Sequence, residues 1–339
     1  MYTEDSFCKQ VLDTTYDKAC EIVQEKKYFE FEIPKKGGSR KISYLPKDSP
    51  LANLQRNLSH SFFCKFDLPI CVKGFRRGES YNSFLYPHIG ARFFLRIDIK
   101  SFFPSLTKSV IKPELIELMK HMFDCDIENL VDLICEIVTL NDKIPQGAYS
   151  SPILSNIIMA RLDQRITKYC QIFNIKYTRY ADDLLFSSID FDFHEKRWFL
   201  RKIKYILLSK KLKLNYSKLK YAENELVLNG YIISSKGIRL SRNRLHDIRH
   251  IVAFVDKNYK MVFEDEATFI QNINEIKLKH RNKDNYKFES VFQLIQYLCG
   301  YRSFIISMLD DAYKYTAHQK NLYQLIRRIE KQIFHLNRI

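Results

Sequence analysis

Two adjacent aspartates, Asp182 and Asp183, interrupt a segment of β-forming and apolar residues, KYTRYADDLLFSS. Neighbouring carboxylates repel each other, and burial among apolar side chains adds a desolvation penalty to each charge. A fold that contains this segment must place the pair at a polar turn, where aspartate is a favoured residue, or beside cations that compensate it. The two residues by themselves leave both alternatives open.

A second segment, FFLRIDIKSFF, alternates apolar and polar residues as a strand does. Asp98 lies on the face opposite to Leu95, Ile97 and Ile99, so its carboxylate points away from the core. If tertiary folding brings Asp98 beside Asp182, their oxygens form a hard-ligand site that suits Mg²⁺. Two such ions close together support in-line displacement at phosphorus, and they would also remove the repulsion between the aspartates.

The composition points to a polyanionic partner. The chain carries a formal net charge of +16 and contains 25 Phe and 21 Tyr. Lysine and arginine attract phosphates, and aromatic rings offer stacking surfaces for nucleic-acid bases. The same numbers also fit a generically basic surface around an aromatic core.

No signal-peptide pattern opens the sequence, and its longest apolar stretch is too short to span a bilayer. The cysteines contain no C-x-x-C pair and no zinc-ligand spacing, which is typical of reduced thiols. We therefore expect a cytoplasmic protein with no membrane partner.

Strand-like and helix-like segments follow one another without the regular alternation of a doubly wound sheet, which predicts an α+β fold. A hairpin with a basic turn is predicted around Gly37 and Gly38, and LVLNGYIISSKGIRLS predicts two short strands. From about residue 240 the chain is predicted to be helical and basic, in segments that include KLKHRNKDNYK. The last helix has an apolar stripe of Leu322, Leu325, Ile326, Ile329 and Ile333, with Arg327, Arg328 and Lys331 off the stripe.

Three motifs occur in order along the chain, FLRIDIKSFFPSL, PQGAYSSPILSNI and YADD. Together they resemble the reverse transcriptases, and more closely those of the bacterial retron type. The resemblance runs from the basic hairpin near residue 35 to the strand pair near residue 233, and it continues weakly into the C-terminal helices. It implies a right-hand polymerase fold. Residues 1–236 would form fingers and palm, with an antiparallel sheet plus helices, and residues 237–339 would form a helical, basic thumb that binds RNA.

The resemblance also implies a two-metal site. Asp98 and Asp182 would be ligands of two Mg²⁺ ions, and Asp183 would stand beside them as a third carboxylate. The backbone carbonyl of Ile99 would help to hold a metal. A divalent cation at this place is one answer to the repulsion between the paired aspartates.

A nucleotide pocket is implied next to these carboxylates. Arg40 and Lys41 would grip the triphosphate from the hairpin. Gln146 and Gly147 would line the pocket, where glycine permits close backbone approach. Phe103 would exclude a ribose 2′-OH, so that dNTPs are preferred to NTPs; the alternative is a core phenylalanine.

Lys218 matches the family's lysine after the catalytic hairpin, where it would stabilise or protonate the leaving pyrophosphate. Its alternative is one solvated lysine among many. In the retron type the end of the thumb holds a stem-loop of the partner RNA, and Arg327, Arg328 and Lys331 would contact that backbone. The alternative there is a solvated basic face with no ligand.

Two departures bear on the branch of the family. The retron type often has N-A-x-x-H before the first aspartate, whereas this chain has YNSFLYPHIG, with Asn82 and His88 more widely spaced. It also usually has V-T-G after the catalytic lysine, whereas Leu228–Gly230 here reads LNG. Whether these departures exclude the retron branch stays open. PQGAYSSP fits the retron and intron branches, and the residues after the LNG strand leave room for a thumb only, which favours the retron type.

These observations predict an RNA-directed DNA polymerase that copies part of a structured non-coding RNA into single-stranded DNA. Its substrates would be dNTPs and its product a branched RNA–DNA (msDNA), made in a retron antiphage defence system with a separately encoded effector protein. One alternative is a stand-alone defence polymerase of the abortive-infection type, without a dedicated RNA template. Another is a catalytically silent RNA-binding protein, against which the intact Asp98, Asp182 and Asp183 argue.

Overall fold

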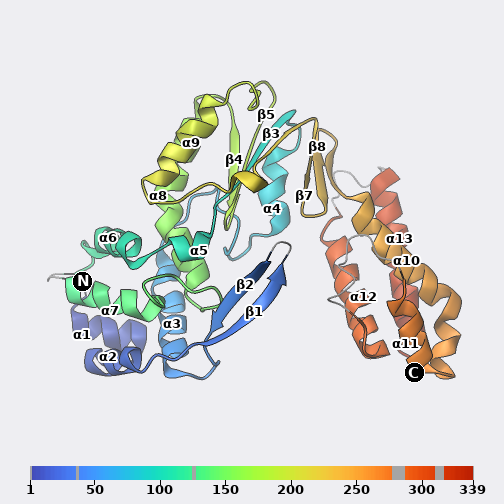
Figure 1. The fold of residues 1–339 in the computed structure, drawn as a ribbon, viewed down its shortest axis with the longest axis horizontal. Coiled ribbons are helices and arrows are strands. Elements are labelled where there is room, and N and C mark those ends of the chain that lie inside the picture. Colours follow the sequence, from blue (N-terminus) through green and yellow to red (C-terminus); the bar gives the residue numbers. More distant parts are fainter. Residues whose placement is uncertain (1, 36–37, 124–126, 277–286, 310–316, 339) are drawn as a thin grey trace. The chain divides into compact units, whose positions relative to one another are not determined.

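The computed structural model describes residues 2–35, 38–123, 127–276, 287–309 and 317–338 (Figure 1). The chain divides into two compact units, Met1–Asn224 and Glu225–Ile339. Strands and helices mix in both units, which confirms the α+β prediction. The predicted basic segment 277–287 lies almost entirely outside the described residues.

The first unit is built around an antiparallel sheet with the strand order β4-β5-β3-β6. These strands span β3 Phe93–Asp98, β4 Lys176–Tyr180, β5 Asp183–Ser188 and β6 Lys220–Glu223. Along β5 every side chain is buried, because the strand lies between two neighbours and under helices. The register places Asp98 opposite Asp183, so the two predicted acidic segments meet at one end of the sheet.

Two helices next to this sheet carry much of its core, α8 Ser151–Gln171 and α9 Trp198–Leu208 (Figure 1). Pro152 sits in the first turn of α8, where a missing N–H has no consequence. Phe199 of α9 packs edge-on against Phe186 of β5, with ring centroids 5.4 Å apart. Such aromatic contacts fix α9 against the sheet.

The hairpin predicted around Gly37 and Gly38 is confirmed. β1 Phe29–Lys35 and β2 Gly38–Tyr44 pair along their whole length, from Phe29 opposite Tyr44 to Lys35 opposite Gly38. Residues 36 and 37, and with them Lys36 of the predicted basic turn, lie outside the described residues.

Short helices complete the first unit. Phe7 and Phe62 meet edge to face at 5.0 Å in the core of its N-terminal part. The N-terminal elements are α1 Glu4–Phe7, a π-helical turn η1 Cys8–Leu12, α2 Tyr16–Gln24, α3 Pro50–Ser61 and η2 Phe63–Lys65. The later ones are α4 Tyr81–Leu85, η3 Tyr86–His88, α5 Phe102–Ser105, α6 Lys108–Met119, α7 Glu128–Val138 and η4 Tyr216–Lys218.

The second unit starts with a three-stranded meander, where two strands were predicted. Its strands are β7 Glu225–Leu228, β8 Tyr231–Ser234 and β9 Gly237–Leu240. Helices follow at α10 Arg242–Asn258, η5 Tyr259–Phe263, α11 Glu266–Asn274, α12 Val291–Ile306 and α13 Ala317–Leu336. The compact units divide after Asn224, and the boundary between palm and thumb after residue 236 stays a prediction. Arg244 of α10 joins the meander to the helices, because its guanidinium lies 5.2 Å from the Tyr231 ring and 4.1 Å from the Phe304 ring.

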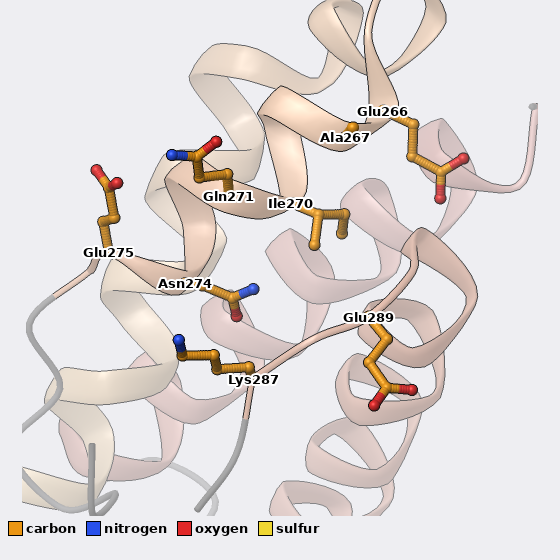
Figure 2. A pocket seen from close by; sticks show the side chains of 8 residues that line it. All are labelled: Glu266, Ala267, Ile270, Gln271, Asn274, Glu275, Lys287 and Glu289. Carbon is orange, nitrogen blue, oxygen red and sulfur yellow. The ribbon is translucent and has the colours of Figure 1, made fainter. Parts of the chain in front are cut away.

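A pocket of about 790 Å³ opens in the second unit between α11 and the segment that leads into α12 (Figure 2). Glu266, Glu275 and Glu289 line it, against the single cation Lys287 among its lining residues. An acidic lining does not suit a phosphate ligand. None of the residues predicted to bind nucleotide or metal lines it.

In the part of the chain that the structure describes, no helix has the length and apolarity needed to cross a membrane.

Candidate active site

The candidate site forms where β3 ends and β4 turns into β5. Tyr180 pairs with Asp183, so Ala181 and Asp182 form a two-residue turn. Ala181 has φ +55°, an uncommon conformation for a residue with a Cβ, which shows that surrounding contacts hold the turn. The Ile99 N–H donates to the Asp182 carbonyl at 3.0 Å. The structure thus brings together the two aspartate segments that the sequence predicted to meet.

Asp98 is almost fully buried and is held by two donors. Asn215 Nδ2 donates to Oδ1 at 2.9 Å, and Lys218 Nζ donates to Oδ2 at 2.8 Å. Half of the Lys218 side chain remains exposed. The structure therefore places Lys218 at the carboxylate site, and its predicted role at the leaving pyrophosphate stays a prediction. Asn215 was not predicted.

Asp183 has a different partner, Arg96. The guanidinium donates from Nε at 3.0 Å and from Nη2 at 2.7 Å, and both bonds end on Oδ1 of Asp183. Burial raises the pKa of the Asp183 carboxyl, and Arg96 opposes this rise. Arg96 lies two residues before Asp98 on the same strand, and the sequence analysis did not single it out. The pairing distinguishes Asp183 from Asp182, its neighbour in the sequence.

Asp182 lies in the electrostatic field of several predicted site residues. Burial raises the pKa of its carboxyl, and the charge of Asp98 adds to the rise, whereas Lys218 and Arg40 oppose it. The two carboxylates therefore repel each other across the site. This leaves Asp98 and Asp182 as a pair of hard oxygen donors whose charges favour a cation between them.

A magnesium ion fits this donor set. Within the described residues no group of three or more acidic, histidine or cysteine side chains is arranged to hold a metal. Mg²⁺ in nucleotide enzymes is commonly bound by one or two carboxylates together with substrate phosphates and water, and Asp98 and Asp182 provide two carboxylates here. Asp98 and Asp182 could hold such an ion, and the Ile99 carbonyl remains a predicted further ligand.

The predicted nucleotide-pocket residues Gln146 and Gly147 lie against the hairpin. The Ser43 N–H donates to the Gln146 carbonyl at 2.7 Å. Gly147 has φ +110°, and a Cβ there would stand 2.9 Å from the Ser43 carbonyl oxygen and 2.8 Å from Ile42 Cγ2. Only glycine allows this approach without strain, so the loop and the hairpin are fixed to each other.

Arg40 and Lys41, both predicted to grip the triphosphate, lie on opposite faces of the hairpin. Arg40 opposes Ile33 in the register and acts on the carboxylate of Asp182. The Lys41 ammonium pairs with Glu30 at 2.6 Å. The structure therefore brings Arg40 to the candidate site and engages Lys41 in an exposed ion pair.

Phe103 is half-buried in the first turn of α5, whereas its neighbour Phe102 is buried. Its ring lies 6.0 Å from that of Phe75, and the Phe75 ring lies 6.5 Å from Tyr180, at the base of the aspartate turn. Phe103 therefore belongs to an aromatic group next to the site. Phe75 was not predicted, and its positive φ of +55° was not apparent from the loop sequence KGFRRG.

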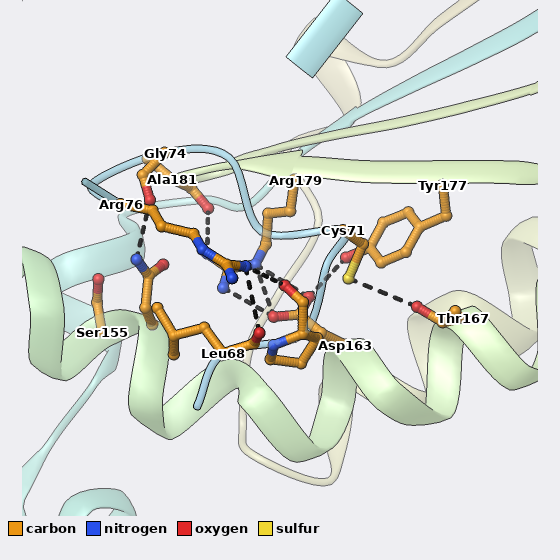
Figure 3. A network of polar contacts seen from close by, with 12 residues as sticks. Leu68, Cys71, Gly74, Arg76, Ser155, Asp163, Thr167, Tyr177, Arg179 and Ala181 are labelled. Carbon is orange, nitrogen blue, oxygen red and sulfur yellow. Dashed lines mark hydrogen bonds and ion pairs between the residues drawn. The ribbon is translucent and has the colours of Figure 1, made fainter. Parts of the chain in front are cut away.

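A buried ion pair between β4 and α8 supports the aspartate turn (Figure 3). Arg179 of β4 donates from Nη2 to Asp163 Oδ2 of α8 at 2.7 Å, and both side chains are fully buried. Tyr177 Oη donates to Asp163 Oδ1 at 2.7 Å. Arg179 also donates from Nη1 to the Ala181 carbonyl at 3.1 Å, so a single guanidinium connects α8 to the turn.

The sequence analysis did not single out Arg179 or Asp163. The sequence NIIMARLDQRI did contain a signal for this ion pair, because Asp163 interrupts an otherwise apolar helix stripe. A buried acid needs a buried cation as its partner. Gly74 packs on the other side of the turn, where an added Cβ would stand 2.6 Å from the Ala181 nitrogen. Asn156 of α8 holds Gly74 by donating to its carbonyl at 2.9 Å.

His88 supports the same hairpin away from the turn. Its ring nitrogens lie 2.7 Å from Ser187 Oγ and 2.7 Å from Thr178 Oγ1, and Thr178 donates its own proton to the Phe84 carbonyl. His88 Nε2 must therefore donate to Thr178, and Nδ1 accepts from Ser187. Burial lowers the pKa of His88 to about 3, so it is neutral and cross-links β4 to β5. Asn82 is buried nearby in α4.

The predicted RNA-binding residues lie on α13, in the second unit. Arg327 and Arg328 are exposed, while Lys331 approaches Asp256 Oδ1 at 3.3 Å. The predicted apolar stripe is confirmed on the opposite side, where Leu322, Leu325, Ile326 and Ile329 are buried and Ile333 is half-buried.

Comparison with known proteins gives a consistent assignment. A family model described as "Reverse transcriptase (RNA-dependent DNA polymerase)" matches residues 33–237. The retron Ec86 reverse transcriptase of Escherichia coli is 31% identical over 227 residues, which are 66% of this chain and 68% of that protein. The retron Mx65 reverse transcriptase of Myxococcus xanthus is 33% identical over 175 residues, 48% of this chain and 41% of that protein.

Among solved structures, telomerase from Candida albicans in complex with a fragment of telomeric RNA has a TM-score of 0.49 at 12% identity, over 93% of this chain and 65% of that chain. The foamy viral protease-reverse transcriptase in complex with double-stranded DNA has a TM-score of 0.40 at 16% identity, over 92% of this chain and 44% of that chain. In several of these matches the chain spans less than two thirds of the other protein.

The buried pair of Arg179 and Asp163 generates a stability prediction. Asp163→Ala leaves an unpaired charge in the core and should lower the free energy of unfolding by about 3–5 kcal/mol. Glu223→Ala is the control, because Glu223 pairs with Arg92 at the surface, where such a pair contributes at most about 1 kcal/mol. Urea unfolding followed by circular dichroism measures both. Equal losses in the two variants would contradict a supporting role for the buried pair.

Proposed function

Since the chain belongs to the reverse transcriptase family and is of the bacterial retron type, we propose that it copies RNA into DNA by nucleotidyl transfer at Asp98 and Asp182. In the family's right-hand fold, residues 1–236 are the proposed fingers and palm, and residues 237–339 are the proposed thumb. The observation that carries the proposal is the meeting of Asp98 and Asp182 beside Lys218 and within the field of Arg40.

Divalent cations are general in this family, and we propose two Mg²⁺ ions held by Asp98, Asp182 and the carbonyl of Ile99. Bound there, they would stabilise the charge on both the attacking and the leaving oxygen. Asp183 remains the proposed third carboxylate. Arg96 binds its Oδ1, so Oδ2 is the oxygen that would turn toward the ions.

The remaining side chains have roles that follow from their positions. Lys218, freed from Asp98 by the bound cations, would donate a proton or a charge-assisted hydrogen bond to the leaving pyrophosphate. Arg40 would bind the triphosphate from the hairpin. Gln146 and Gly147 would form the wall against which the nucleotide packs, and Lys41 would assist once it leaves Glu30.

The proposed template is a structured non-coding RNA, part of which is copied into single-stranded DNA, as in a retron that serves antiphage defence with a separate effector protein. This step rests on similarity to retron reverse transcriptases. Arg327, Arg328 and Lys331 are the proposed contacts to a stem-loop of that RNA, since double-stranded RNA is recognised mainly through its shape and backbone.

The first test is substitution of the aspartates. Asp98→Asn and Asp182→Asn should abolish incorporation of labelled dNTPs on a primed RNA template with Mg²⁺, because each removes a proposed metal ligand. Asp183→Asn should reduce incorporation less completely, since Arg96 already engages this carboxylate. The control is Asp190→Asn, an exposed aspartate after β5, which should retain full activity. Wild-type synthesis by Asp182→Asn would refute the assignment.

A second test concerns the sugar. Phe103→Ala should raise the incorporation of NTPs relative to dNTPs at least about tenfold, because it opens the space beside the 2′ position. Phe173→Ala, which removes a half-buried ring remote from the site, controls for general loosening. Single-nucleotide incorporation with both substrate types gives the ratio. If Phe103→Ala leaves the ratio unchanged, Phe103 is a packing residue.

The third test concerns α13. Changing Arg327, Arg328 and Lys331 together to alanine should weaken binding of the cognate RNA and reduce the salt slope by roughly one unit per lost phosphate contact. Lys331 should contribute least, because Asp256 already pairs with it. The matched control changes the exposed Arg242, Lys257 and Lys260 of the same unit. An unaltered affinity and slope in the α13 variant would place the stem-loop elsewhere.

A further inference from the structure

Apart from Lys218, the cations of one strongly basic segment lie outside the sites described so far. Between Lys196 and Lys220 the sequence contains ten lysine or arginine residues and no aspartate or glutamate. This segment forms α9 and the connection from α9 to β6. Lys210 pairs with Glu114, Lys218 pairs with Asp98, and Arg197 donates from Nε to the His194 carbonyl.

Five of the exposed cations of the segment form what we call the α9 surface: Arg201, Lys202, Lys204, Lys211 and Lys213. Among the residues that the structure describes, none of the five has a carboxylate within salt-bridge distance. Two like charges that lie three or four residues apart on one face of a helix destabilise the helix by roughly a few tenths of a kcal/mol. A polyanion bound to the surface would remove this repulsion.

Exposed tyrosines lie between these cations. Tyr205 is 67% exposed, and Lys202 Nζ lies 5.6 Å from its ring centroid. Tyr216 is 57% exposed, and Lys204 Nζ lies 5.8 Å from its ring centroid. Cations for phosphates beside open aromatic faces for bases are the combination with which proteins bind single-stranded nucleic acid.

The opposite side of α9 holds the helix in place. Phe199, Ile203, Ile206 and Leu207 are buried. Phe199 stacks on Tyr169 of α8, with centroids 5.7 Å apart and the planes at 16°. The helix therefore cannot turn its basic side inward, and the α9 surface is a permanent feature of the unit.

The segment also leads directly to the candidate active site. Lys100, two residues beyond Asp98, donates its N–H to the Lys213 carbonyl at 2.8 Å. Asn215 donates its N–H to the Asp98 carbonyl at 2.8 Å, and its side chain holds the Asp98 carboxylate. A strand engaged at the carboxylates can thus continue along the same stretch of chain onto α9.

We propose that the α9 surface binds a single-stranded segment of the partner RNA outside the catalytic site. The inference rests on the proposed function, in which an RNA must be held before any DNA exists. The unpaired cations match its phosphates, and Tyr205 and Tyr216 offer stacking faces that the bases of a duplex could not use. This surface is separate from the α13 residues, which were assigned to a structured stem-loop.

The test uses the full chain with Arg201, Lys202 and Lys204 all changed to glutamine. The matched control changes Lys9, Lys47 and Lys65 to glutamine, which removes the same charge from exposed positions elsewhere in the unit. Fluorescence anisotropy over a range of KCl concentrations measures binding of an unstructured RNA oligonucleotide, the same sequence as DNA, and an RNA hairpin.

The α9 variant should bind the unstructured RNA at least about tenfold more weakly than the parent, with a salt slope lower by roughly 0.7 per lost contact. Its binding of the hairpin should change little, and so should the control variant's binding of all three probes. Tyr205→Ala should weaken unstructured RNA about fivefold or more through lost stacking, without altering the salt slope.

Several results would overturn the proposal. An α9 variant that binds unstructured RNA as the control does shows that the surface has no such ligand. An equal loss for the hairpin shows a duplex site, and a loss confined to DNA shows a site for the product strand. A separate assay tests the proposed function itself: wild type and α9 variant should both extend a short preannealed primer–template. If the wild type extends nothing, the result refutes the proposed polymerase activity and leaves the α9 surface to be judged by the binding assay.

Discussion

The buried ion pair between Arg179 and Asp163 is the interaction on which the candidate site depends. An unpaired charge in this core would be prohibitive, so the two side chains must meet, and their meeting fixes α8 against β4. The same guanidinium holds the Ala181 carbonyl, which keeps a residue with a Cβ in the left-handed region. Gly74 closes the other side. The position of Asp182 is therefore set by groups that need touch no substrate.

Each aspartate of the site is compensated differently, which resolves the problem of the paired charges. Asp183 faces a fixed guanidinium on its own sheet, whereas Asp98 faces a lysine on a flexible and half-exposed stem. The charge of Asp182 is compensated by a backbone hydrogen bond and by the more distant charges of Lys218 and Arg40. The charge that remains is concentrated on Asp98 and Asp182, the two carboxylates that a divalent cation would need. Adjacent residues at one turn thus acquire distinct chemistry from their surroundings.

Local patterns in the sequence were sufficient to predict the strand of Asp98, the β1–β2 hairpin and the apolar stripe of α13. Each of these features follows from residues that are only a few positions apart. Local patterns were not sufficient for Arg96, Asn215 and Phe75, whose partners are distant in the chain or depend on an unusual backbone angle. The packing of Arg244 on rings of two other elements could not be predicted for a similar reason.

Net charge alone could not distinguish a nucleic-acid partner from a generically basic surface, and the structure shows why. Some cations serve the fold or the site, as Arg179, Arg96 and Lys218 do by pairing with buried carboxylates. In the part of the chain that the structure describes, the cations of the α9 surface pair with no carboxylate. They lie beside the exposed rings of Tyr205 and Tyr216. Because only unpaired cations are available to release counterions from a phosphate backbone, it is their location that carries information about the partner. In the first unit that location adjoins the segment that holds Asp98.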